Sequence, residues 1–252
     1  MQFLLLVVAI HVLALGRAEI DADGAQGWRA GENVVLSPVV KENLRTAEGG
    51  GFGVDVSAQM SSSTASCLVS QGFGSIIIPR GYKSVGSVDT AVCATLNAAV
   101  SAGIKIRDAY IFPDPTGTKS ARTQLTELVN YLAANCKSAW TGRIWLDVEG
   151  SQYWKGDFAA NKQFYQELYD SCAALGVSCG VYSSSYQWQS LFGSTSYCYG
   201  SASPLWYAHY DNVAAFSDYS PFGCWSKPWA KQYKGDTTMC NFSVDLNWSP
   251  YF

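Results

Sequence analysis

One run of the chain, Arg143-Ile144-Trp145-Leu146-Asp147-Val148-Glu149-Gly150, has the apolar character of a buried strand and ends with two carboxylates. Residues two apart in a strand point to the same side, so Trp145, Asp147 and Glu149 share one face and the apolar residues between them share the other. Burying a carboxylate costs free energy or raises its pKa until it keeps its proton. The pair therefore indicates either an acid with an assisting carboxylate or a helix cap or buried ion pair.

Strand and helix patterns alternate on both sides of this run, which is typical of parallel β-α units. About five such units are followed by a strand-rich C-terminal part, and 252 residues is close to the usual length of a barrel of this kind. We therefore predict an α/β fold, an irregular single-domain (β/α) barrel. Its predicted strands are 53–56, 75–79, 104–112, 143–150, 180–182, 205–209, 230–233 and 242–246, and its predicted helices are 61–71, 88–102, 118–136 and 158–175.

The N-terminal part of the chain differs in composition from the rest. Residues 3–15 form an apolar run followed by small residues, which predicts a signal peptide over residues 1–18. Residues 19–50 are rich in Gly, Asp and Glu and are interpreted as an extension or pro-segment, with the barrel domain over 51–252. No second apolar run is long enough to cross a bilayer. We expect a soluble protein that is secreted or delivered to lysosomes or phagosomes.

The cysteines and the charge narrow the possible partners. The eight cysteines are even in number and contain no CxxC pair, which predicts disulfides rather than zinc and leaves 105 pairings open. Removing residues 1–18 takes away Arg17 and no acidic residue, leaving 16 basic and 20 acidic residues, a net charge of −4. This balance argues against nucleic acid and anionic membranes as partners. We expect a monomer without a metal or other cofactor.

Two further sites repeat the pattern of an aspartate between apolar neighbours. They are Val54-Asp55-Val56 and Val244-Asp245-Leu246, which match Leu146-Asp147-Val148. In a barrel the apolar neighbours face the helices while the aspartates point inward, and the chemistry lies at the C-terminal ends of the strands. Taken singly, Asp55 is more simply a cap. Taken together, the three sites predict a cluster of carboxylates.

Other catalytic machinery is nearly absent from the sequence. Outside the predicted signal peptide the only histidine is His209, and the chain contains neither a GxSxG nor an HExxH motif. We interpret His209 as a hydrogen-bonded strand residue beside the site. A mechanism that depends on carboxylates alone indicates glycoside hydrolysis, in which one group protonates the leaving oxygen and another stabilises the positive charge at the sugar carbon.

Aromatic residues at the predicted strand ends supply candidate sugar contacts. Aromatic residues make up 14% of the chain, and sugar rings present C–H faces that stack on aromatic planes. Tyr110, Tyr182, Tyr233 and Trp206 are the residues that we predict to bind substrate. Each is also compatible with a purely structural role, because large aromatic side chains dominate protein cores.

With these residues assembled, the chain resembles the family 25 glycoside hydrolases, the lysozymes that cleave peptidoglycan. The resemblance runs in the family's order over about residues 52–248. The cysteine content suggests a secreted eukaryotic branch, and the extension over residues 19–50 departs from the family pattern. The matching segments are Gly53-Val54-Asp55-Val56-Ser57, Ala109-Tyr110-Ile111-Phe112, Leu146-Asp147-Val148-Glu149, Gly180-Val181-Tyr182-Ser183, Gln232-Tyr233 and Val244-Asp245-Leu246-Asn247.

The resemblance implies a function and a role for each carboxylate. It implies an N-acetylmuramidase that hydrolyses the β-1,4 bond between N-acetylmuramic acid and N-acetylglucosamine in bacterial peptidoglycan, for nutrition or defence. Glu149 is then the general acid, Asp147 assists through the substrate's N-acetyl group, and Asp55 and Asp245 line the site. We expect Asp55 and Asp245 to raise the pKa of Glu149, since like charges favour a neighbour's neutral form.

Two other functions remain open from the sequence. One is a chitinase-like glycosidase, although the longer acidic run ending in Glu of barrel chitinases is missing. The other is a sugar-binding protein that has lost turnover on the same barrel, although all four carboxylates are present. Of two N-glycosylation sequons, we expect Asn241 to be the better acceptor and Asn247 to be structural.

Overall fold

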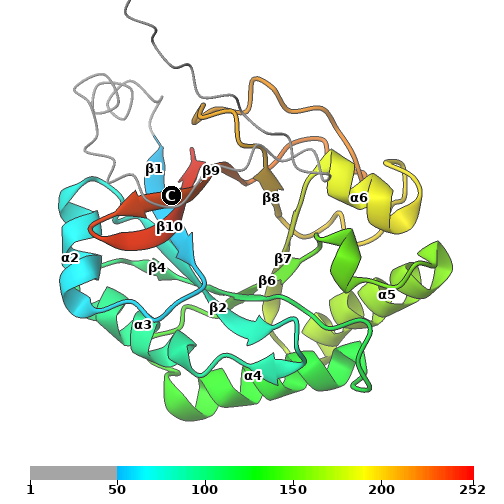
Figure 1. Cartoon of the computed structure of the whole chain (residues 1–252), viewed down its shortest axis with the longest axis horizontal. Helices are drawn as coiled ribbons and strands as arrows, with labels where there is room; N and C mark the ends of the chain where they lie inside the picture. The colour runs from blue at the N-terminus through cyan, green and yellow to red at the C-terminus, as the bar shows by residue number, and fades with distance from the viewer. Residues whose placement is uncertain (1–49) are drawn as a thin grey trace, which may run out of the picture.

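Eight strands close into a barrel in the part of the chain that the computed structural model describes, residues 50–252 (Figure 1). Closure occurs at the first strand, which pairs with the second strand on one side and with the last strand on the other. The predicted irregular α/β barrel is therefore confirmed. In spatial order the strands are β1 (Gly51–Val56), β2 (Ile76–Lys83), β5 (Ala109–Ile111), β6 (Arg143–Asp147), β7 (Ser178–Ser183), β8 (Leu205–Ala208), β9 (Ala230–Met239) and β10 (Phe242–Ser249).

The irregularity of the barrel lies in β10. Neighbouring strands from β1 through β9 are parallel, whereas β10 runs antiparallel to both β9 and β1. β9 and β10 thus form a hairpin that needs no connecting helix. This agrees with the predicted strand-rich end of the chain. Two further short strands, β3 (Ser87–Val88) and β4 (Ile106–Arg107), pair with β2 beside the barrel.

The helices form an arc around the outside of the strands (Figure 1). Each of α2, α4, α5 and α6 begins after a Ser or Asp whose side chain accepts a hydrogen bond from a backbone N–H of the first turn. Such a cap contributes about 1 kcal/mol. The helices are α2 (Ser62–Ser70), α3 (Ala91–Ser101), α4 (Ala121–Asn135), α5 (Phe158–Ala174) and α6 (Ser185–Phe192), with a short 3₁₀ helix, η1 (Ser151–Tyr153), after β6.

The structure differs from the predicted elements in two places. The predicted strand 104–112 is interrupted at Asp108, which separates β4 from β5. Helix α6 was not predicted, because its serine and glutamine content hides the pattern. Its buried residues Trp188, Leu191 and Phe192 nevertheless have helical spacing, and the Ser184 side chain accepts a hydrogen bond from the backbone N–H of Gln187 as an N-cap does.

The side chains of β6 and of Val148, which follows it, alternate between two sides of the strand, as the sequence predicts. Ile144, Leu146 and Val148 lie in the core between the barrel and helices α4 and α5. Trp145 instead lies in the barrel interior with residues from β2, β7 and β8. The same alternation directs Val54 and the other apolar neighbours of the aspartates toward the helices.

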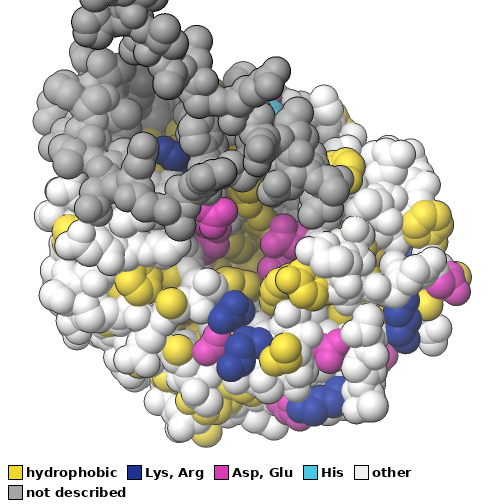
Figure 2. All heavy atoms as spheres, viewed as in Figure 1, with side chains coloured by type: hydrophobic (Ala, Val, Ile, Leu, Met, Phe, Trp, Pro, Cys, Tyr) yellow, Lys and Arg dark blue, Asp and Glu magenta, His cyan; other side chains and the backbone are white. Residues whose placement is uncertain are grey.

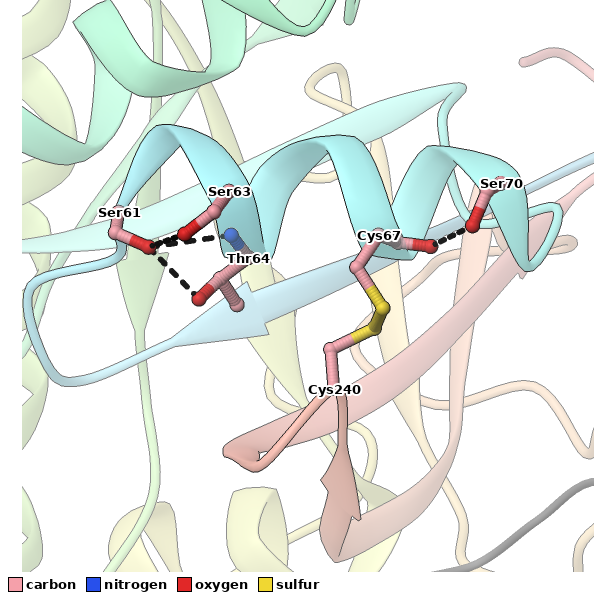
Figure 3. Close-up of a disulfide and its surroundings, with 6 residues drawn as sticks. All are labelled: Ser61, Ser63, Thr64, Cys67, Ser70 and Cys240. Atoms are coloured by element: carbon pink, nitrogen blue, oxygen red, sulfur yellow. Dashed lines mark hydrogen bonds between the residues drawn. A yellow bond between two sulfur atoms is a disulfide. The ribbon is translucent and has the colours of Figure 1, made fainter.

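All eight cysteines form disulfides, which confirms the prediction of disulfides over zinc. Figure 3 shows the bond that joins Cys67 of α2 to Cys240 in the turn between β9 and β10. It connects the first helix of the barrel to the antiparallel hairpin, across 173 residues of sequence. The other pairs are Cys93–Cys136, Cys172–Cys179 and Cys198–Cys224.

The predicted signal peptide over 1–18 and nearly all of the extension over 19–50 lie outside the described residues. No helix within residues 50–252 has both the length and the apolar character needed to span a membrane.

We predict that Gly180→Ala destabilises the barrel. A Cβ atom at Gly180 in β7 would lie 2.2 Å from Cζ3 and 2.4 Å from Cε3 of Trp145, which is fully buried in the interior. Overpacking of this kind costs about 1–3 kcal/mol. Urea denaturation of the two proteins measures the change in the free energy of unfolding. Gly156→Ala is the matched control, since a Cβ atom there meets nothing within 4 Å. Equal effects of the two substitutions would contradict this packing.

Candidate active site

Four carboxylates meet at one end of the barrel, as the sequence predicts. Asp55 of β1 and Asp245 of β10 are directly paired across the two strands. Asp147 is the last residue of β6, and Glu149 follows two residues later. Glu149 raises the pKa of both Asp55 and Asp147, and Asp245 raises that of Glu149, so the four groups form one electrostatic cluster. Figure 2 shows acidic side chains bordering a hollow in the middle of the visible face.

Asp55 accepts two hydrogen bonds from side-chain amides. Its Oδ1 atom accepts a hydrogen bond from Gln232 Nε2 at 2.8 Å and another from Asn247 Nδ2 at 2.7 Å. Burial raises the pKa of Asp55 to about 6, and these two hydrogen bonds oppose the rise because they favour the charged form. Asp55 is therefore held in a fixed orientation, and its pKa lies close to neutral pH.

Asp147 is in the opposite situation. Its side chain is buried, and its Oδ1 atom has no hydrogen-bond partner among residues 50–252. Burial raises its pKa well above the usual range, and the charges of Glu149 and Asp55 raise it further. A buried acceptor without a donor costs about 1–3 kcal/mol, so this oxygen is available to a donor that a ligand brings.

Glu149 has the pKa that a general acid needs. Burial is the main cause that raises its pKa to about 7, and the charge of Asp245 is the second. The direction agrees with the prediction from the sequence, but burial contributes more than the negative neighbours do. Asp245 itself has a pKa raised well above its usual range, by burial first and by Asp55 second. Its Oδ1 atom accepts a hydrogen bond from the backbone N–H of Asp236 at 2.7 Å.

A side chain that was not singled out from the sequence, Gln232, connects the carboxylates to two tyrosines. Its Nε2 atom donates to Asp55 and, at 3.2 Å, to Asp245 Oδ2. Its Oε1 atom accepts from Tyr182 Oη at 2.5 Å and from Tyr210 Oη at 2.8 Å. All the polar atoms of this amide are thus engaged. A polar residue at an inward position of a buried strand was the signal that could have identified it.

Asn247 acts in a similar way on β10. Its side chain is fully buried, donates to Asp55 and accepts a hydrogen bond from Trp206 Nε1 at 2.8 Å. The side-chain amide is therefore engaged inside the barrel, as expected for a structural asparagine. Asn241 is exposed in the turn between β9 and β10.

The structure brings three of the four predicted aromatic residues together. Tyr110, Tyr182 and Trp206 lie in the barrel interior, and the rings of Tyr182 and Trp206 are 4.6 Å apart between centroids. The pKa of Tyr110 and that of Tyr182 are raised by burial first and by neighbouring carboxylates of the cluster next. Trp206 is only 2% exposed, so it supports Tyr182 from within the core.

Tyr233 is not placed with the others. It packs against Phe52 on the side of β9 that faces the helices, with ring centroids 6.4 Å apart. Strand alternation is the reason, because Gln232 takes the inward position next to it. The prediction that Tyr233 binds substrate therefore does not fit the geometry of this strand, and the inward residue of the Gln232-Tyr233 pair is the amide.

His209 lies outside the carboxylate cluster. Its Nδ1 atom is 2.5 Å from Asp218 Oδ2, which agrees with its interpretation as a hydrogen-bonded residue. With Asp211 it forms a group that has the spacing of metal ligands. The ammonium group of the fully buried Lys231, however, lies 2.7 Å from a carboxylate oxygen of each aspartate. The lysine thus supplies the positive charge that these carboxylates need.

Most of this chain is similar to known proteins. A family model described as lysozyme-like protein 1 matches residues 46–233. The chain is 42% identical to probable GH family 25 lysozyme 2 of Dictyostelium discoideum over 198 residues, which cover 79% of this chain and 90% of the relative. It is 38% identical to lysozyme-like protein 5 of Caenorhabditis elegans over 200 residues, which cover 79% of this chain and 91% of the relative.

The fold is also found among solved structures. The bacterial lysozyme from Streptomyces coelicolor superposes with a TM-score of 0.62 over 79% of this chain and 92% of that chain. The two sequences are 23% identical, so this likeness concerns the fold alone.

We predict that Gln232→Met raises the pKa of Asp55 above about 6. The substitution keeps the length of the side chain but removes the amide that donates to Asp55 and lowers its pKa. A ¹³C NMR titration of the Asp55 carboxyl carbon measures the change. Gln189→Met, at an exposed position of α6, is the matched control and should leave the titration unchanged. An unaltered Asp55 titration in Gln232→Met would show that this hydrogen bond does not set the pKa.

Proposed function

This chain belongs to the GH family 25 lysozymes and is a glycoside hydrolase, and we propose that it cleaves bacterial peptidoglycan. The bond is the β-1,4 linkage between N-acetylmuramic acid and N-acetylglucosamine. The observation that carries the proposal is Glu149, a carboxyl group with a pKa of about 7 beside a second buried carboxyl group at the end of β6. A carboxyl group with this pKa keeps its proton up to near neutral pH, as a general acid that acts there must.

In the first step Glu149 donates its proton to the glycosidic oxygen as the bond to the sugar carbon breaks. The electron pair of that bond stays with the oxygen of the departing N-acetylglucosamine. The carbonyl oxygen of the substrate's own N-acetyl group attacks the sugar carbon and forms a positively charged cyclic intermediate. Water then opens the ring and transfers a proton to the Glu149 carboxylate, which restores the acid.

Asp147 is suited to assist this internal attack. Its Oδ1 atom is buried and lacks a donor among the described residues, and the N–H of the N-acetyl group is a donor of the right kind. Binding of that N–H favours the charged form of Asp147. The carboxylate then orients the N-acetyl group and stabilises the positive charge that develops on it.

The remaining residues of the site set the pKa of Glu149, border the substrate space or contact the sugar. Asp245 raises the pKa of Glu149 through its charge. Asp55 is fixed by Gln232 and Asn247 and borders the same space. Tyr110 and Tyr182 contact the sugar in this proposal.

The disulfides indicate the compartment in which the protein acts. Four disulfides that use every cysteine are stable in oxidising surroundings. We infer that the protein is secreted or reaches lysosomes or phagosomes by a signal peptide over residues 1–18, with residues 19–50 as an extension and 51–252 as the catalytic domain. It acts there as a monomer on bacterial walls, for nutrition or defence.

We predict that Glu149→Gln reduces kcat by about 10²–10⁴-fold, because the amide has no proton to give. The measurement is the release of reducing ends from purified peptidoglycan. Glu167→Gln on α5 is the matched control and should retain activity, since this side chain is exposed and accepts a hydrogen bond from the backbone N–H of Arg122.

Three outcomes would contradict the proposal. An active Glu149→Gln variant would remove Glu149 from the role of acid. Faster release from pure chitin would indicate a chitinase-like enzyme. Tight binding of peptidoglycan by the wild type without release of reducing ends would indicate a binding protein.

We predict that Asp245→Asn moves the loss of activity at high pH to a lower pH. Glu149 acts only when protonated, so kcat/KM falls as the pH rises through its pKa of about 7. Asp245 raises this pKa as a negative neighbour, and its removal lowers the pKa. A pH profile of kcat/KM measures the shift, with Asp170→Asn on α5 as the control. A shift toward higher pH would contradict the assigned sign.

A further inference from the structure

A second cavity lies at the end of the barrel opposite the four carboxylates. Its volume is about 460 Å³, within the usual range of small-molecule sites. Arg143 and Leu205, which line it, are the first residues of β6 and β8, and Trp229 immediately precedes β9. Asp147 is the last residue of β6, at the opposite end of that strand from Arg143, and Asp55 lies near the corresponding end of the parallel strand β1. The two sites are therefore separated by the full depth of the barrel.

Within residues 50–252, the guanidinium group of Arg143 in this cavity forms no ion pair. It lies 4.7 Å from the ring centroid of Trp229 and 5.3 Å from that of Trp145. Its Nε atom is buried without a hydrogen-bond partner in the described part of the chain. The salt bridges found within residues 50–252 do not include Arg143. A guanidinium group that lines the cavity thus has no carboxylate within ion-pair distance among these residues.

Asp108, whose pKa the charge of Arg143 lowers, forms its hydrogen bonds with other residues. Asp108 accepts hydrogen bonds from Thr141 Oγ1 at 2.7 Å and from Trp145 Nε1 at 3.1 Å. Arg143 lowers the pKa of Asp108 only through its charge, and burial, the largest influence, raises it. Asp108 does not line the cavity. It therefore leaves the donors of the guanidinium group available.

The rest of the wall combines a second positive charge with aromatic surface. Lys227 is exposed at the rim, with its ammonium group 5.8 Å from the ring centroid of Tyr251. The residues that line the cavity include Trp225, Trp229, Ser201 and Ser203 but no Asp or Glu. Two cations, aromatic faces and hydroxyl groups without an acid are the features that a negatively charged sugar requires.

We propose that this cavity is a binding site for an anionic saccharide, whose carboxylate or phosphate is held by Arg143 and Lys227 beside Trp229. The guanidinium fork matches the geometry of both anions. The cavity has room for one sugar residue with its charged substituent, so it fits the end of a glycan or a substituent of one. The proposal goes beyond hydrolysis and relies on the proposed function only for the source of such sugars, the bacterial wall.

The test is a titration of the full-length protein with three monosaccharides, monitored by NMR at the indole N–H of Trp229. The carboxylate arm is N-acetylmuramic acid, the phosphate arm is N-acetylglucosamine 6-phosphate, and the neutral arm is N-acetylglucosamine. We expect saturable shifts with at least one anionic sugar and none with the neutral sugar. The arm that binds more tightly identifies the source of the anion.

Two variants localise the effect. Arg143→Gln should weaken binding about tenfold or more, because a hydrogen bond to a charged group is lost. Lys227→Gln should weaken it about threefold, and its exposed position leaves the fold intact. Lys137→Gln, also exposed, is the matched control and should bind as the wild type does.

Three results would overturn the proposal. These are equal binding of the neutral sugar, no shift at Trp229 with either anion, and unchanged affinity in both Arg143→Gln and Lys227→Gln. The titration detects binding at the end of the barrel opposite the four carboxylates and does not require turnover. Repeating it with Glu149→Gln therefore separates a failure of this site from a failure of the proposed hydrolysis.

Discussion

The exclusion of water from four neighbouring carboxylates is the constraint on which the site depends. In water Asp55, Asp147, Glu149 and Asp245 would all be charged near pH 7. Burial is the largest influence on each and raises every one of the four pKa values. The buried carboxyl groups thus keep their protons at pH values at which isolated side chains would release them. The same burial costs stability as the pH rises, since groups whose pKa is raised by folding favour the native state below that pKa.

Hydrogen bonds then distinguish one carboxylate from another within this shared environment. Asp55 receives donors from Gln232 and Asn247, and its pKa rises only to about 6. Asp147 is without a donor for its buried Oδ1, and its pKa rises well above the usual range. Both donors to Asp55 come from the β9–β10 hairpin. The β9–β10 hairpin, whose turn the Cys67–Cys240 disulfide joins to α2, therefore shapes the electrostatics as well as closing the barrel.

Much of this arrangement could be predicted from local patterns in the sequence. Apolar neighbours on both sides of an aspartate predict an inward carboxylate, and the three sites that share this pattern do converge. The side of β9 that faces inward was harder to predict, because Gln232 and Tyr233 are both plausible ligands and a single residue of register decides between them. Tyr210 lies in the connection after β8, where no periodic pattern fixes the direction of a side chain. Its contact with Gln232 depends on tertiary structure alone.

The alternation of β6 explains how one strand serves both ends of the barrel. Arg143, Trp145 and Asp147 occupy successive inward positions, so a cation, an indole ring and a carboxyl group follow one another along the barrel axis. At a rise of about 3.3 Å per residue, the first and last of these backbones are about 13 Å apart. Trp145 fills the space between them and needs Gly180 opposite, where a Cβ atom would clash. A tightly packed interior transmits little motion unless it has a second packed arrangement. An anion bound to Arg143 would therefore change the pKa of Glu149 only through the screened charge of the anion.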